Sequence, residues 1–122
     1  MASFTSFEEI IAWQKARENT KLIYGLTKKQ EFLQDFELRN QIRGSATSVM
    51  ANIAEGFDRD TDKEFVRYLF IARASNSETL SHLYVALDQE YIRQEGFHKM
   101  KEKIIEVKKL LNGFISYLNK KN

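Results

Sequence analysis

Apolar residues recur at steps of three and four along most of the chain, the spacing that is typical of amphipathic α-helices. The clearest run alternates the two steps like a heptad seam. It comprises Phe97, Met100, Ile104, Val107, Leu111, Phe114 and Leu118. This run predicts a helix over about residues 96–119.

Two further core stripes occupy the middle of the chain. One comprises Leu38, Ile42, Ala46, Val49 and Ile53, and the other comprises Phe65, Leu69, Ala72, Leu80, Leu83 and Leu87, with Asn76 as an interruption. They predict helices over about residues 35–55 and 61–89. Thr61 and Glu64 form a capping box at the start of the second helix. Gly56 follows the first helix, where a left-handed capping residue is expected.

A second capping box, Ser6 with Glu9, starts a helix over about residues 7–28. Connections at residues 29–34, 56–60 and 90–95 are short, which makes sequential helices antiparallel. The predicted fold is therefore all-α, an antiparallel up-down-up-down left-handed four-helix bundle that forms a single domain over residues 1–122.

The composition restricts the class of protein. A chain of 122 residues can bury a hydrophobic core without disulfides or a structural metal. This chain has no Cys, no Pro and five Gly. Its N-terminus, from Met1 to Ser6, lacks a basic region followed by an apolar run, and no apolar stretch approaches the roughly 18 residues of a membrane span. We expect a soluble, cytoplasmic protein without a membrane segment.

The charge is nearly balanced, with 19 Lys and Arg against 17 Asp and Glu, a net charge of +2. Any nucleic-acid-binding surface must therefore come from local clustering of basic residues. Candidates on the two central helices and their connection are Arg39, Arg43, Arg59, Lys63, Arg67 and Arg73. If the two helices align as a hairpin, these residues form a band of positive charge that can contact phosphates. Because Asp58, Asp60, Asp62 and Glu64 are interspersed, a salt-bridged surface is the alternative.

Catalytic and metal motifs are weak. Helical bundles hold di-iron sites with paired Glu-x-x-His motifs, and Glu95 with His98 supplies a single copy at a helix boundary. Neither His82 nor His98 has a recognisable nucleophile partner, and no Gly-rich phosphate loop is present. We expect no catalytic residues, no cofactor and no metal, and hence a protein that is not an enzyme.

The helix predicted over residues 35–55 has two unusual sides. It carries no charged residue between Gly44 and Ala54, and small residues form a stripe opposite its core line, namely Gly44, Thr47, Ala51 and Ala54. Central burial and contact with another subunit both explain that stripe. A polar stripe beside the core comprises Gln41, Ser45, Ser48, Asn52 and Glu55. Because Glu55 lies at a helix C-terminus, an arginine should compensate it, and a structural clasp is favoured over a ligand site.

Several segments together resemble a known family. They are Phe7–Arg17, Gln41–Arg43, the motif Asn52–Phe57, Lys63–Phe65, and Ala86–Asp88 with Tyr91–Ile92. The chain resembles the bacterial four-helix-bundle proteins encoded in intervening sequences of large-subunit ribosomal RNA genes, a family that includes accessory proteins of diversity-generating retroelements.

The resemblance implies a non-catalytic homo-oligomeric scaffold, with a pentamer as the expected assembly. Within the matching segments, we interpret Asn52, Glu55, Gly56 and Phe57 as a structural motif. Members associated with retroelements bind nucleic acid through basic surfaces, so RNA or DNA is the expected partner. A protein–protein adaptor that binds no nucleic acid is the alternative function.

Overall fold

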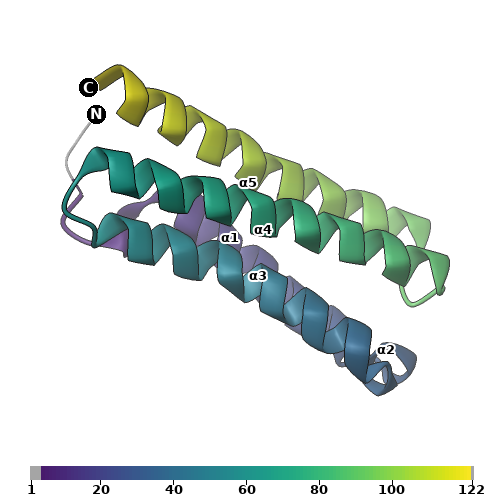
Figure 1. Cartoon of the computed structure of the whole chain (residues 1–122). Helices are drawn as coiled ribbons and strands as arrows, with labels where there is room; N and C mark the ends of the chain where they lie inside the picture. The colour runs from purple at the N-terminus through teal and green to yellow at the C-terminus, as the bar shows by residue number, and fades with distance from the viewer. Residues whose placement is uncertain (1–3, 122) are drawn as a thin grey trace.

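The computed structural model describes residues 4–121, and helices are its regular elements there. In chain order they are the 3₁₀ turn η1 (Phe7–Glu9), α1 (Ile11–Thr27), α2 (Gln30–Gln34), α3 (Phe36–Phe57), α4 (Asp62–Asp88) and α5 (Gln94–Lys121). The four long helices form a bundle (Figure 1), which confirms the predicted all-α four-helix bundle. The first residues used in the N-terminal prediction, Met1–Ser3, lie outside the described part of the chain.

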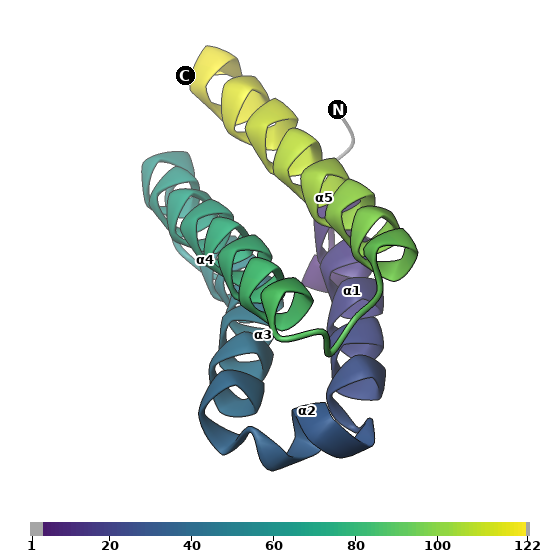
Figure 2. The ribbon, with the colours of Figure 1, turned by 90° about the vertical axis from the view of Figure 1, so that its right-hand side faces the viewer.

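Consecutive long helices run in opposite directions (Figure 1). Contacts follow the ring α1–α3–α4–α5, in which α3 and α4 share the most extensive pairing, and α2 bridges α1 and α3 (Figure 2). One end of the bundle holds η1, the α3–α4 connection and the end of α5, and we call it the turn end. The opposite end, with α2 and the α4–α5 connection, is the α2 end. The left-handed supercoil stays a prediction.

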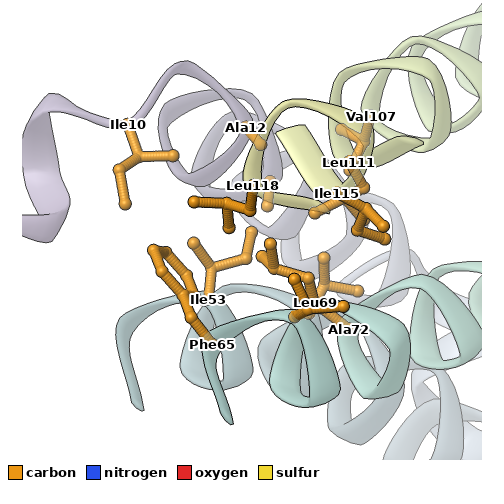
Figure 3. Packing of buried hydrophobic residues seen from close by; sticks show 13 residues of the cluster. Ile10, Ala12, Ile53, Phe65, Leu69, Ala72, Val107, Leu111, Ile115 and Leu118 are labelled. Carbon is orange, nitrogen blue, oxygen red and sulfur yellow. The ribbon is translucent and has the colours of Figure 1, made fainter. Parts of the chain in front are cut away.

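The core consists of two hydrophobic clusters, one toward each end. The turn-end cluster contains Ile10, Ala12, Ala16, Val49, Ile53, Phe65, Val66, Leu69, Ala72, Val107, Leu111, Ile115 and Leu118 (Figure 3). The α2-end cluster contains Ile23, Leu26, Phe32, Leu38, Ile42, Ala46, Leu83, Ala86, Phe97, Met100 and Ile104. Each long helix contributes to both clusters, because its apolar stripe runs along its whole length.

A buried polar layer separates the clusters. Its side chains are Asn19, Thr20, Ser45, Ser75, Asn76 and Thr79. Asn76 Nδ2 donates to the carbonyl oxygen of Ile104 (2.8 Å) and Asn19 Nδ2 to that of Lys103 (3.2 Å). Thr79 Oγ1 donates to Ser45 Oγ (2.8 Å). The interruption of the predicted stripe at Asn76 is therefore a hydrogen-bonded element of the core, and hydrogen bonding is what makes its burial tolerable.

The predicted start of the first helix is wrong. Ser6 N and Thr5 N donate to the Glu9 carboxylate (3.0 and 2.9 Å), and the hydrogen bond from the Thr5 hydroxyl lowers the pKa of Glu9. These contacts close only the single turn η1, since Ile10 is extended (φ −75°, ψ 120°) and α1 begins at Ile11. The capping signal was real, but Ile10 turns its side chain into the core, where it is 1% exposed.

The connection predicted over residues 29–34 contains a helix of its own, α2. Its Phe32 is buried at 1% exposure, whereas Leu33 is exposed. A single buried residue in a five-residue helix cannot produce a helical period in the sequence. The other helices begin and end close to the predicted residues: Asp35 Oδ1 caps α3 by accepting from Leu38 N (3.1 Å), and Thr61 Oγ1 caps α4 by accepting from Glu64 N (3.2 Å).

Gly56 is not a left-handed cap, because none of the glycines in the described chain has a positive φ. It is buried within the last turn of α3. A Cβ at this position would lie 2.7 Å from Tyr68 Cβ and 2.9 Å from Phe65 Cδ1. Gly56 is therefore needed for the close approach of α3 and α4. The left-handed residue is Glu90 (φ 64°), where Tyr91 N bonds to Ala86 O (2.9 Å) and ends α4 in a Schellman arrangement.

Two details of the predicted core lines also change. Leu80 and Leu87 of α4 are only half-buried, and Thr79 lies in the core beside them. On α5, Phe114 is half-buried and Ile115 is buried. Within residues 4–121, no helix is long and apolar enough to cross a membrane.

Candidate nucleic-acid interface

Arg39 and Arg43 lie on the side of α3 that faces the α1–α2 region. Arg43 Nε donates to Thr27 Oγ1 (2.8 Å), and its guanidinium lies 4.5 Å from the centre of the Tyr24 ring. Arg39 Nη1 donates to the carbonyl oxygen of Leu33 (3.1 Å). Both arginines are therefore engaged by their own chain.

Arg59 and Arg67 lie at the turn end and enclose the ring of Tyr68. Their guanidinium carbons are 4.7 and 5.0 Å from its centre, and Arg59 Nη2 also donates to the Tyr68 hydroxyl. Arg59 Nη2 lies 3.4 Å from Glu55 Oε1, and Arg67 Nε lies 3.3 Å from Glu64 Oε2. The hydrogen bond to Glu64 raises the pKa of Arg67. Glu55 therefore has the arginine partner that its position at a helix C-terminus requires.

The remaining two candidates point elsewhere. Lys63 is exposed on the first turn of α4. Arg73 reaches α5, where its Nη1 donates to Asn112 Oδ1 (2.8 Å), and its guanidinium lies 4.8 Å from the centre of the Phe70 ring. The six predicted residues thus face the α1–α2 region, the turn end and α5. The structure does not bring them together as one band.

The motif Asn52–Phe57 joins α3 to α4. Asn52 Nδ2 donates to the Ser48 carbonyl oxygen (2.8 Å) and to Ser48 Oγ (3.0 Å), and Ser48 Oγ lies 3.0 Å from Ser75 Oγ on α4. The Phe57 ring meets the Phe65 ring edge to face, with centroids 6.2 Å apart. Together with the close approach at Gly56, this geometry fits a structural clasp, because the motif's groups contact their own chain.

The small-residue stripe of α3 is not centrally buried. Gly44 and Ala51 are exposed, Thr47 and Ala54 are half-buried, and a Cβ on Gly44 would meet nothing within 4 Å. One bundle therefore leaves this side of α3 uncovered, and of the two explanations for the stripe, burial within a single chain is wrong.

Sequence reasoning overlooked α5 as the most basic helix. Gln94–Lys121 contains seven Lys and three Glu, whereas α3 and α4 together contain five basic and six acidic residues. A count of charge for each predicted helix would have found this difference. Lys101 reaches α4, where its Nζ donates to the Tyr84 hydroxyl (2.8 Å) and lies 5.4 Å from the centre of that ring. Lys108 is exposed.

The interior offers little space for a ligand. Inward polar groups, Asn19, Thr20, Asn76 and Thr79, surround a cavity of about 10 Å³, which is the room needed for one water molecule. Within residues 4–121, no three His, Asp or Glu side chains lie close enough to hold a metal ion. Glu95 pairs with Lys99 on the surface (3.6 Å), and His98 is exposed.

Comparison with known proteins gives the family. The model of the 23S rRNA-intervening sequence protein family matches residues 8–113. The chain belongs to this family. The match covers α1 to α4 and most of α5, including the clasp motif and the polar layer. The resemblance seen in the sequence is therefore confirmed.

A solved structure supports the assignment. A protein with unknown function from the S23 ribosomal protein family of Bacteroides thetaiotaomicron is 28% identical to this chain and superimposes with a TM-score of 0.78. The alignment covers 86% of this chain and 98% of that protein. A comparison with curated proteins gives no match. Family and fold are thus established, and neither the family name nor this neighbour describes an enzyme.

Proposed function

We propose that this protein is a non-catalytic, homo-oligomeric four-helix-bundle scaffold that binds RNA or DNA phosphates through basic side chains. The observation that carries the proposal is the separation of two kinds of surface. The outer side of α3 is small and uncharged from Gly44 to Ala54, and the basic excess lies on α5. An assembly formed through the first surface leaves the second free for a polyanion.

The outer side of α3 has the character of a subunit contact. Its small residues permit close approach of a second helix, and on α4 the apolar side chains Ile71 and Val85 are 39% and 42% exposed. Covering apolar surface is favourable at roughly 25 cal/mol per Å². A second copy of the chain is the proposed occupant, and a pentamer is the assembly that the family resemblance implies.

The oligomer is tested by measuring the mass of the native protein with light scattering after size exclusion. We expect Ala51→Arg, which places a charge on the α3 face, to yield a helical protein of lower mass. Ser116→Arg on the exposed side of α5 is the matched control and should keep the wild-type mass. A monomeric wild-type protein at micromolar concentration would contradict the proposal.

Binding is tested by fluorescence anisotropy with labelled structured RNA and single-stranded DNA across a salt titration. Affinity that falls steeply as salt rises supports phosphate contact, because binding releases condensed counterions. Arg43→Glu with Arg67→Glu should preserve the fold and shows how much the originally predicted residues contribute. A folded oligomer that binds neither probe at low salt would instead favour the protein adaptor.

A further inference from the structure

The seam between α4 and α5 combines cations with exposed aromatic rings. On α4, Phe70, Arg73, Ser77 and Tyr84 follow one another at steps of three, four and seven, and on α5, Lys101, Lys108 and Asn112 follow at steps of seven and four. Residues at such steps share one side of a helix. The bonds Arg73–Asn112 and Lys101–Tyr84 join the two lines. Lys108 therefore lies along the seam between them.

The aromatic rings in this seam remain accessible. Phe70 is 43% exposed and Tyr84 is 41% exposed. Arg73 lies over Phe70, and Lys101 lies beside the ring of Tyr84. Each ring is thus held next to a positive charge, which pairs a surface for stacking with a group that attracts phosphate.

Most acidic side chains of α4 and α5 lie off the seam, but Asp88, four positions after Tyr84, is exposed on the same side of α4. On α4, Glu64 bonds to Arg67 and Glu78 bonds to His82, both along α4 itself. On α5, Glu102 and Glu106 lie at least about 100° around the helix from Lys101 and Lys108, because successive residues turn by about 100°. The seam therefore keeps a net positive charge, with Arg73, Lys101 and Lys108 against the carboxylate of Asp88 at its α2 end.

We propose that this seam binds single-stranded nucleic acid, a proposal that rests on the nucleic-acid-binding function above and gives it a place. Bases stack on Phe70 and Tyr84, and Arg73, Lys101 and Lys108 contact the phosphates. The two rings are 14 positions apart on α4, about 21 Å, which suits a strand of several nucleotides. A duplex presents no unstacked bases to these rings, so the seam favours single strands.

The first experiment measures anisotropy of labelled oligouridylate and oligothymidylate against a hairpin duplex with the same number of nucleotides. The full-length wild-type protein should bind both single strands more tightly than the duplex. The two single strands separate RNA from DNA as the source of the ligand. A duplex that binds equally well or better would overturn the proposal.

Charge reversal then places the site. Lys101→Glu with Lys108→Glu changes the net charge from +2 to −2 and should weaken single-strand binding roughly tenfold or more through lost phosphate contacts. Lys21→Glu with Lys28→Glu changes the net charge equally at exposed sites of the α1 region and is the matched control. An equal loss of single-strand affinity in both variants would show a general effect of net charge and would overturn the proposal that the seam is the binding site.

Removing the rings tests stacking separately from charge. Phe70→Ala with Tyr84→Ala should weaken single-strand binding by about thirtyfold or more, because two base stacks are lost, each in the range found for aromatic side chains, and should leave duplex binding unchanged. Tyr84 also meets the Phe97 ring, so Phe70→Ala alone is the second variant, and circular dichroism checks the fold. Phe36→Ala, an exposed ring on α3, is the control.

The outcomes separate this proposal from the general function. Nucleic-acid binding that survives in all seam variants would place the site elsewhere and leave the scaffold function standing. If no probe binds at low salt, both proposals fail. Loss confined to the seam variants supports both.

Discussion

The two ends of the core are closed by different means. At the turn end, α3 passes directly into α4, with Gly56 against Tyr68 and the Phe65 ring edge to face with Phe57 and Phe114, at centroid distances of 6.2 and 5.1 Å. At the α2 end, a separate short helix places Phe32 over the core. Its ring stacks on Tyr91, with centroids 5.0 Å apart.

This difference shows that the ends of a bundle are closed both by contacts between residues close in the sequence and by contacts between residues far apart in it. At the turn end, the α3–α4 turn itself depends on near neighbours such as Gly56 and Phe65, and Phe114 of α5 packs against it. The α2 end depends on pairs such as Asp35 and Tyr91, which are 56 positions apart and joined by a hydrogen bond of 2.9 Å. With the polar layer between the clusters, we expect damage at the α2 end to remain more local than damage at the turn end.

The largest effect is expected from Ile53→Asp in the turn-end cluster. Ile53 is 0% exposed, and an unpaired charge in this place costs more than a small domain can tolerate. The variant should not fold, as shown by loss of helical circular dichroism. Ala51→Asp, two residues away and exposed, should remain helical. A soluble, fully helical Ile53→Asp protein would refute the observed core.

Phe32→Ala should come next, with a loss of about 3–5 kcal/mol, the usual cost of emptying a buried aromatic site. Urea denaturation measures the loss, and hydrogen exchange locates it. Exchange should rise around α2 and the α4–α5 connection and change little around the α3–α4 turn. Leu33→Ala, at the exposed neighbouring position, should stay within about 0.5 kcal/mol. An equal rise in hydrogen exchange at both ends would contradict the expected difference between them.

Gly56→Ala should destabilise by about 1–2 kcal/mol, because the added Cβ overlaps Tyr68 Cβ and the two helices must separate. This cost outweighs the better helix propensity of Ala. Gly113→Ala on α5, where a Cβ meets nothing within 4 Å, should instead stabilise by up to about 1 kcal/mol. Thermal melts compare the pair. A stabilised Gly56→Ala protein would mean that the close approach does not require glycine.

The smallest effect is expected from Tyr91→Phe. The hydrogen bond to the Asp35 carboxylate raises the pKa of Tyr91 in the folded state above its usual value of about 10. The stabilisation is therefore complete below about pH 10 and is lost as the pH rises through the ionisation of Tyr91. The variant keeps the stacked ring, should melt slightly below wild type at neutral pH, and should converge with wild type in alkaline buffer. A pH-independent difference would exclude this linkage.

Much of the fold was predictable because it depends on periodicity. Apolar stripes such as Leu38–Ile53 and Phe97–Leu118 predict a helix independently of the elements that pack against it. Thr61 caps its helix through a residue of the same turn. α2 was not predicted because it has one buried residue, Phe32, and a single buried position gives no helical periodicity in the sequence. Gly56 was misread because a glycine at a helix end suits both a left-handed cap and a close contact, and only the position of Tyr68 distinguishes them.

The candidate site was less predictable than the fold. Arg43 and Arg67 look equivalent in the sequence, but one bonds to Thr27 in the α1–α2 region and the other bonds to Glu64 at the turn end. The seam is assembled from α4 and α5 residues that are 17 to 39 positions apart where they bond, Tyr84 with Lys101 and Arg73 with Asn112. No spacing rule within one helix connects them.

The sequence by itself determined the existence of the four long helices, the all-α class and the family, since each depends on apolar periodicity within a helix or on motifs a few residues long. The tertiary structure decided which charges are occupied, which faces are uncovered and how each end of the core is closed. These features depend on the rotation of each helix about its axis and on pairing across the bundle. Apolar residues at steps of three and four indicate which side of a helix faces the core. Only the packing of α4 against α5 brings Lys101 to Tyr84.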